Sequence, residues 1–128
     1  MNVIKMMVVL LLGVTTMAAQ EIEFKQETID FGKVAYNSEG KRTFEFTNVG
    51  SEPLIIKEVK SSCGCTVPRK PEKPIMPGEK SYIDVAYDTK RIGGFMKSLI
   101  VYSNSKEQRK VIKIKGFVER INNTIVSN

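Results

Sequence analysis

Two cysteines separated by one residue are the side chains of this sequence whose type and spacing most favour chemistry. Cys63 and Cys65 flank Gly64 in the stretch SSCGCTVP, and they are the only cysteines of a chain that has no histidine. A thiol pair this close can form a disulfide, exchange with a disulfide of another protein, or bind a soft metal ion. It can also stay reduced and pack as two small apolar groups.

Backbone geometry decides whether the two sulfur atoms can meet. On a regular strand, residues i and i+2 share a face and their Cα atoms lie about 6.4–6.8 Å apart. A disulfide needs β-carbons about 3.8 Å apart, which two parallel side chains on a strand do not reach. A turn or bulge at Gly64 would bring the sulfur atoms closer, because glycine adopts dihedral angles that other residues avoid. The residues alone therefore leave the disulfide, the metal site, the exchange and the free thiols open.

Cu(I) is the metal ion that such a pair suits best. It prefers soft sulfur ligands and accepts few of them, whereas a structural zinc ion normally needs four ligands. Cys63 and Cys65 are the candidate ligands, and Met76 or Met96 is a candidate third ligand if the fold brings it close. Copper is the one cofactor that the sequence suggests.

The first 19 residues indicate the compartment. They combine a positive charge at Lys5, an apolar run from Met6 to Val14, and small or uncharged residues up to Ala19. This is the layout of a secretory signal peptide. The apolar run is too short to span a membrane, and no later stretch is longer. We therefore expect cleavage, a periplasmic or secreted protein without a transmembrane anchor, and an oxidising environment for the cysteines.

The remaining chain alternates apolar and polar residues with the period of a half-buried strand. Turn-forming residues separate these segments, and no window has the repeat of an amphipathic helix. We predict an all-β fold, namely an immunoglobulin-like antiparallel β-sandwich of about seven strands over residues 20–120, followed by a C-terminal tail at 121–128. The clearest strand segments are 28–34, 41–49, 54–60, 81–89, 96–104 and 110–118.

Composition argues against several classes of function. Without histidine the commonest general base is absent, so we expect no enzyme. The formal charge of +6 comes from basic residues spread over most predicted strands and turns. Because nucleic-acid binding needs these charges gathered on one surface, and because export removes the chain from the cytoplasm, we expect no nucleic-acid partner.

Several motifs resemble a known family. The stretch SSCGCTVP, the turn IMPGEK, the segment VAYDT and the closing IKIKGFV resemble the DUF1573 type, a bacterial secreted family of unknown function with a Cys-Gly-Cys-Thr signature. The resemblance covers residues 22–118. It implies export and an immunoglobulin-like fold of the kind found in the Hydin and major-sperm-protein group, and it implies no activity.

We therefore predict an exported, non-catalytic binding or assembly module of the bacterial cell envelope. Its partner would be another envelope protein, which adds a strand to an exposed sheet edge. The alternative prediction is a Cu(I)-binding or thiol-disulfide exchange protein that acts through Cys63 and Cys65.

Overall fold

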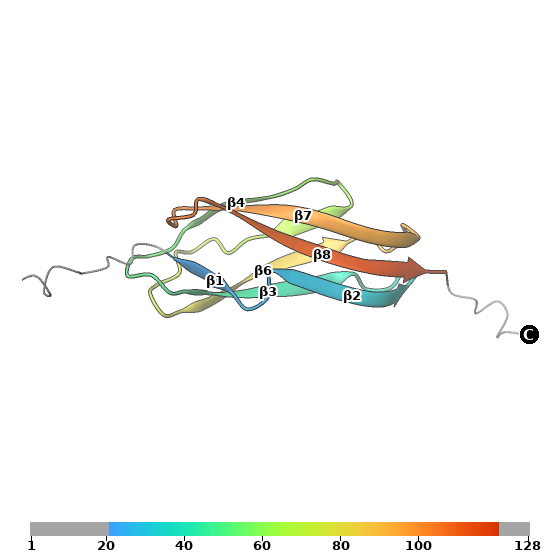
Figure 1. Cartoon of the computed structure of the whole chain (residues 1–128), viewed down its shortest axis with the longest axis horizontal. Coiled ribbons are helices and arrows are strands. Elements are labelled where there is room, and N and C mark those ends of the chain that lie inside the picture. Colours follow the sequence, from blue (N-terminus) through green and yellow to red (C-terminus); the bar gives the residue numbers. More distant parts are fainter. Residues whose placement is uncertain (1–20, 121–128) are drawn as a thin grey trace, which may run out of the picture.

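The computed structural model describes residues 21–120, which form eight β-strands (Figure 1). None of these residues forms a helix long and apolar enough to cross a membrane. The predicted all-β class is confirmed, whereas the expected signal peptide (1–19) and tail (121–128) lie outside the described residues. The strands are β1 (Ile22–Phe24), β2 (Thr28–Ala35), β3 (Lys41–Asn48), β4 (Ile56–Ser61), β5 (Thr66–Arg69), β6 (Lys80–Tyr87), β7 (Gly93–Ser103) and β8 (Arg109–Glu119).

The strands form two four-stranded sheets. Sheet A has the order β1-β3-β6-β5, and sheet B has the order β2-β8-β7-β4. In Figure 1, β8 and β2 of sheet B lie in front of the strands of sheet A. Apart from a first strand that is divided between the sheets, this is the strand arrangement of the immunoglobulin fold. The predicted immunoglobulin-like sandwich is therefore confirmed.

The core lies between the two sheets and follows from the alternation of the sequence. In β3, Phe44 and Phe46 are buried, while Thr43 and Glu45 face the opposite side of the sheet. Full burial of a large apolar side chain stabilises the fold by about 1.5–3 kcal/mol, so this layer dominates the stability. Other fully buried members are Leu54, Ile83, Val85, Leu99, Val101, Ile112, Ile114 and Val118.

The sheets differ from the prediction in strand number and in the direction of one pair. Residues 21–120 form eight strands instead of about seven, and β2 pairs with β8 in parallel where only antiparallel pairs are predicted. The cause is the divided first strand. β1 pairs with β3 up to Phe24, and residues 25–27 then carry the chain to sheet B, where β2 continues in the same direction beside β8 (Figure 1).

Contacts with β8 hold this crossing segment in place. The amide N–H of Lys113 donates to the carbonyl of Glu27 (2.8 Å), and the ammonium of Lys110 lies 2.9 Å from the Glu27 carboxylate. The hydrogen bond to Glu27 raises the pKa of Lys110, although partial burial opposes this. The chain is thus fixed at the point where it leaves sheet A.

Candidate functional site

The cysteine pair lies where the chain passes from sheet B to sheet A. β4 is an edge strand of sheet B, β5 is an edge strand of sheet A, and the connection 62–65 joins them. The amide N–H of Thr66 donates to the carbonyl of Cys63 (3.2 Å), which closes a four-residue turn. The pair therefore lies in a turn. A regular strand, which would disfavour an internal disulfide, is not present at these two residues.

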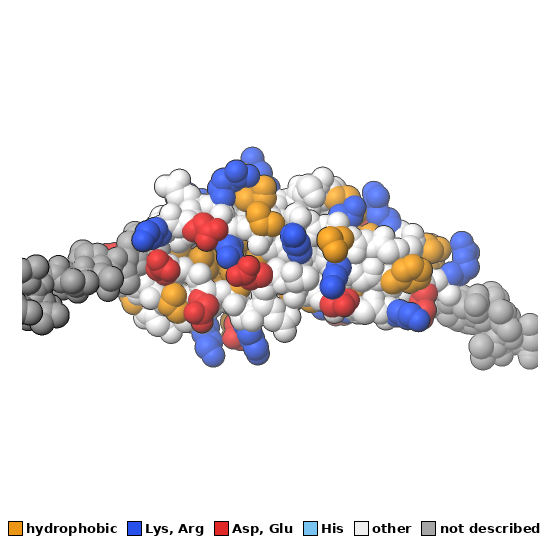
Figure 2. All heavy atoms as spheres, viewed as in Figure 1, with side chains coloured by type: hydrophobic (Ala, Val, Ile, Leu, Met, Phe, Trp, Pro, Cys, Tyr) orange, Lys and Arg blue, Asp and Glu red, His pale blue; other side chains and the backbone are white. Residues whose placement is uncertain are grey.

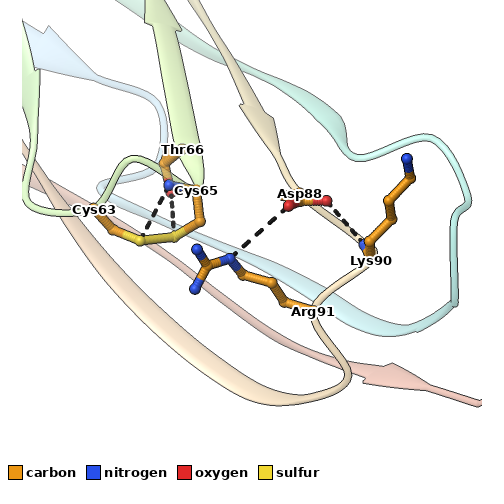
Figure 3. A network of polar contacts seen from close by, with 6 residues as sticks. All are labelled: Cys63, Cys65, Thr66, Asp88, Lys90 and Arg91. Atoms are coloured by element: carbon orange, nitrogen blue, oxygen red, sulfur yellow. Dashed lines mark hydrogen bonds and ion pairs between the residues drawn. A yellow bond between two sulfur atoms is a disulfide. The ribbon is translucent and has the colours of Figure 1, made fainter.

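In this turn the two sulfur atoms are joined, with an S–S distance of 1.96 Å and a Cα–Cα distance of 5.1 Å (Figure 3). Cys65 is buried in the core, and Cys63 is partly buried against it. The carbonyl of Cys65 accepts the amide N–H of Asp88 (2.9 Å), whose carboxylate in turn accepts the amide N–H of Lys90 (3.0 Å) and lies 3.9 Å from Arg91 Nε. The turn is thus tied to the loop after β6.

Gly64 does not have the role that its residue type suggests. It lacks a positive φ, and a β-carbon added to it would meet no atom within 4 Å. The turn therefore bends without the unusual dihedral angles that only glycine adopts readily.

Substituting both cysteines by serine should lower the free energy of unfolding by about 1.5–2 kcal/mol. The chain-entropy relation gives about 1.6 kcal/mol for a closed loop this short, because it restricts the unfolded chain very little. Urea denaturation of the oxidised protein and of the Cys63→Ser, Cys65→Ser variant measures the difference. A loss above about 4 kcal/mol would show that the pair organises the core rather than one turn.

The described part of the chain offers little support for a complete metal site. No group of three or more His, Cys, Asp or Glu side chains within residues 21–120 is placed to hold an ion. Met96, one of the two candidate thioether ligands, projects from the outer face of β7 and is exposed, whereas Cys65 is buried between the sheets. The joined sulfur atoms would have to be reduced before they could act as thiolate ligands.

Sequence reasoning missed a second feature, the uncovered edge of β3. β1 pairs with β3 only at residues 46–48, because the chain then crosses to sheet B. The last contact before the crossing is the hydrogen bond from the Lys25 amide N–H to the Glu45 carbonyl (2.9 Å). Residues 41–44 of β3 therefore have a strand partner only on the β6 side.

Hydrogen-bond alternation identifies the unpaired groups on this edge. The amide N–H of Tyr87 donates to the carbonyl of Gly40 (2.9 Å), which fixes the phase of the antiparallel ladder between β3 and β6. In that phase the even-numbered residues of β3 direct their N–H and C=O groups toward β6, and the odd-numbered residues direct theirs away. The N–H and C=O of Thr43 and the N–H of Glu45 thus face outward from the sheet edge.

A groove of about 360 Å³ lies beside these groups. Ile29 of β2 and Phe44 of β3 supply its apolar walls, so the groove runs between the edges of the two sheets. Its remaining lining is polar or amphipathic and consists of Lys25, Gln26, Arg42, Thr43, Glu45 and Tyr82. No pattern of side-chain types marks this site, because its hydrogen-bonding groups belong to the backbone.

The opposite edge of sheet A is closed to an added strand. The amide N–H of Asp88 donates to the carbonyl of Cys65 (2.9 Å), so Thr66 and Pro68 are the β5 residues that face outward. Pro68 has no N–H, and the N–H of Thr66 already donates to Cys63 within the turn. The outer edge of β5 therefore presents no free amide donor.

The edges of sheet B carry other features that discourage strand addition. β2 has a bulge between Asp30 and Lys33, where the amide N–H of Gly32 donates to the Asp30 carboxylate (2.8 Å). β4 is irregular near its start and exposes the charged side chains of residues 57, 58 and 60. Bulges and charges on an edge strand disfavour pairing with another chain. The open part of β3 carries neither a bulge nor a proline.

Comparison with known proteins identifies the family. The model of a family described as "Protein of unknown function (DUF1573)" matches residues 22–118. This chain belongs to the DUF1573 family. The resemblance found in the sequence is therefore confirmed, and no functionally curated protein has a matching sequence.

Solved structures share the fold of this DUF1573 protein at low sequence identity. A Porphyromonas gingivalis W83 protein of unknown function has a TM-score of 0.71 and 19% identity, over 83% of this chain and 50% of that one. The PapD-like domain 7 of human CEP192 has a TM-score of 0.67 and 8% identity, over 85% and 92%. A chain from the pre-assembly complex of a chaperone and a tip adhesion subunit of Acinetobacter baumannii Csu pili has a TM-score of 0.53 and 16% identity, over 79% of this chain and 57% of that one.

These similarities establish a PapD-like and immunoglobulin-like architecture for the DUF1573 chain. The chain spans about half the length of the P. gingivalis protein, so that protein contains a further part. At these identities the comparison informs the fold alone.

Proposed function

We propose that this DUF1573 protein is an exported, non-catalytic binding module of the bacterial cell envelope that takes an extended segment of a partner protein onto the open edge of β3. The observation that carries the proposal is the set of outward-facing backbone groups at Thr43 and Glu45 beside an apolar-walled groove. Addition of a strand to a sheet edge supplies hydrogen-bond partners to such groups.

The expected interaction is modest in strength and specific in geometry. Each backbone hydrogen bond to the added strand contributes about 0.5–1.5 kcal/mol, and about three are available on the open part of β3. The partly buried Ile29 offers apolar contact for side chains of the partner, and contacts of this kind are how strand addition gains selectivity. A partner segment with apolar residues at every second position fits this arrangement.

The cysteine pair has a supporting role in this proposal. As a disulfide, it stiffens the turn that leads into β5, in keeping with an oxidising periplasmic or extracellular location. A chain of the A. baumannii complex between a chaperone and a tip adhesion subunit shares the fold, which supports a protein-binding use of this architecture. Copper binding or thiol exchange would instead require reduction of the pair and access to the buried Cys65.

Replacing Thr43 by proline should abolish partner binding and leave sheet A intact. Proline removes the outward N–H of Thr43, while the ladder between β3 and β6 uses the even-numbered residues. A photoreactive amino acid at Gln26, which lines the groove, should capture a partner in expressing cells, and the proline variant should lose at least about nine-tenths of the adduct. Thr43→Val is the matched control, because it removes the hydroxyl bond to Asp84 (2.9 Å) but keeps the N–H.

Several outcomes would contradict the proposal. They are an adduct that survives Thr43→Pro, one that forms equally well from a probe at Lys57 on β4, and the absence of any adduct from Gln26. If the proline variant unfolds, Ile29→Lys places a charge in the apolar wall and must also abolish capture. A Cys63→Ser, Cys65→Ser variant should keep the adduct, and its loss would transfer the function to the cysteines.

A further inference from the structure

The outer face of sheet B carries basic side chains interleaved with exposed apolar ones. Side chains alternate along β7 and β8. Leu99 on β7 and Ile112 and Ile114 on β8 are fully buried, so the residues next to them in the sequence point away from the core, on the outer face of sheet B. Figure 2 shows lysine or arginine side chains interleaved with hydrophobic ones over β8 and β2. We call this surface the β7–β8 face; it comprises Asp30, Lys33, Glu58, Lys60, Met96, Ser98, Ile100, Tyr102, Arg109, Val111, Lys113, Lys115, Phe117 and Glu119.

The charges of the β7–β8 face are predominantly basic. Its five lysines and arginines outnumber three acids, while the outer face of sheet A has as many acids as bases, with Lys41, Arg69 and Lys80 against Glu23, Glu45 and Asp84. Within the described residues, Lys33, Lys113 and Lys115 form no ion pair. Their charges are available to an anionic partner.

Exposed apolar side chains lie among these charges. Met96 is 65% exposed, Phe117 47% and Val111 44%. Ile100 stands opposite Val111 in the register of β7 and β8, and it extends the apolar surface across both strands. The ring of Tyr102 lies within 5.8 Å of the cationic groups of Lys60 and Arg109. Apolar and cationic groups therefore alternate over the whole face.

A shallow depression of about 390 Å³ lies at the Phe117 end of this face. Gly94 stands opposite Phe117 in the register and contributes no side chain, so the flank of the ring stays open. Met96, Lys33 and Lys115 also line the depression, as does Asp30, whose carboxylate is engaged by the amide N–H of Gly32. The depression thus combines apolar walls with two lysines at one end of the sandwich.

We propose that the β7–β8 face docks on the surface of an anionic phospholipid bilayer. Lysines attract anionic headgroups, and each one near such a surface strengthens binding about fivefold. Met96 and Phe117 provide apolar side chains that enter the boundary between headgroups and acyl chains, while the lysine stems lie along the apolar surface with their charges at the headgroups. An acidic polymer would satisfy the lysines but would leave the interleaved apolar side chains exposed to water.

Co-sedimentation with lipid vesicles tests the proposal. The protein is purified from the envelope of expressing bacteria, so that all variants share one processed form. We expect binding to vesicles of equal parts phosphatidylglycerol and phosphatidylcholine, and none to pure phosphatidylcholine. Lys113→Glu with Lys115→Glu should weaken binding at least about tenfold, whereas Arg69→Glu with Lys80→Glu, the same charge change on the outer face of sheet A, should weaken it by less than about threefold.

The apolar part of the proposal needs its own variant. Met96→Ser with Phe117→Ser should weaken binding to the anionic vesicles at least about fivefold at unchanged net charge. Equal losses from both charge-reversal pairs would overturn the proposal, because only net charge would then matter. Binding that ignores Met96 and Phe117, or that an acidic polysaccharide matches at equal charge density, would assign the face to a polymer. Absence of binding to anionic vesicles would also overturn it.

Discussion

Replacing Asn48 by alanine is expected to lower the free energy of unfolding by about 2–4 kcal/mol. Asn48 ends β3 and is fully buried. Its Nδ2 group donates to the carbonyls of Glu52 and Ile75 (both 2.8 Å), and its Oδ1 accepts the amide N–H of Gly50 (2.9 Å). Alanine would remove the side-chain partner of the Glu52 carbonyl and of the Gly50 amide N–H, whereas the Ile75 carbonyl would still accept the amide N–H of Leu54 (2.8 Å).

Urea denaturation measures this loss, and Asn104 provides the matched control. Asn104 makes similar bonds, accepting the amide N–H of Ile55 (2.8 Å) and donating to the carbonyl of Pro53 (3.1 Å), but it is only partly buried. Water can replace its bonds, so Asn104→Ala should cost about 1 kcal/mol or less. Equal losses at both positions would contradict the role of burial.

Replacing Gly40 by alanine should cost at least about 3 kcal/mol. A β-carbon at this position would lie 2.1 Å from the carbonyl oxygen of Tyr87 and 3.0 Å from Thr89 Cγ2. The Gly40 carbonyl also accepts the amide N–H of Tyr87 (2.9 Å), and the amide N–H of Asn37 donates to the carbonyl of Thr89 (3.0 Å). Since the clash is with backbone, the loop before β3 and the loop after β6 would have to separate.

Gly64→Ala is the control for this substitution. Gly64 has open space at the β-carbon position and an ordinary φ, so alanine there should change the free energy of unfolding by no more than about 0.5–1 kcal/mol. Thermal unfolding of both variants distinguishes the two environments. A Gly40→Ala protein that unfolds at the temperature of the parent would show that the loops yield easily.

The strands and the core were largely predictable because their signal is local. Alternation in the segment around Phe44 and Phe46 follows from the geometry of a half-buried strand. The division of the first strand was not predictable. The apolar residues change from even positions, Ile22 and Phe24, to odd positions, Ile29 and Phe31, and a turn or a bulge would produce the same change of phase as a crossing between sheets. Alternation states which face is buried, but not which sheet the strand joins.

The candidate sites show the same limit. Cys63 and Cys65 were recognisable by type and spacing, although the turn that brings them together depends on the hydrogen bond between Thr66 and Cys63. The open edge of β3 consists of backbone groups, and only the pairing of strands distant in sequence leaves them free. Asn48 lies near the end of the predicted strand segment 41–49, and no sequence feature marks its burial, which depends on hydrogen bonds to residues 75–79.

The absence of free amide donors on β5 has a consequence for stoichiometry. The open part of β3 lies on one side of sheet A, whereas β5 on the other side has Pro68 and the occupied N–H of Thr66 on its outer edge. One molecule therefore cannot receive a strand on one side of this sheet and template the next molecule on the other. If a partner strand is added at β3 as proposed, β5 offers no amide donors to a further strand, which disfavours growth into a continuous fibre through this edge.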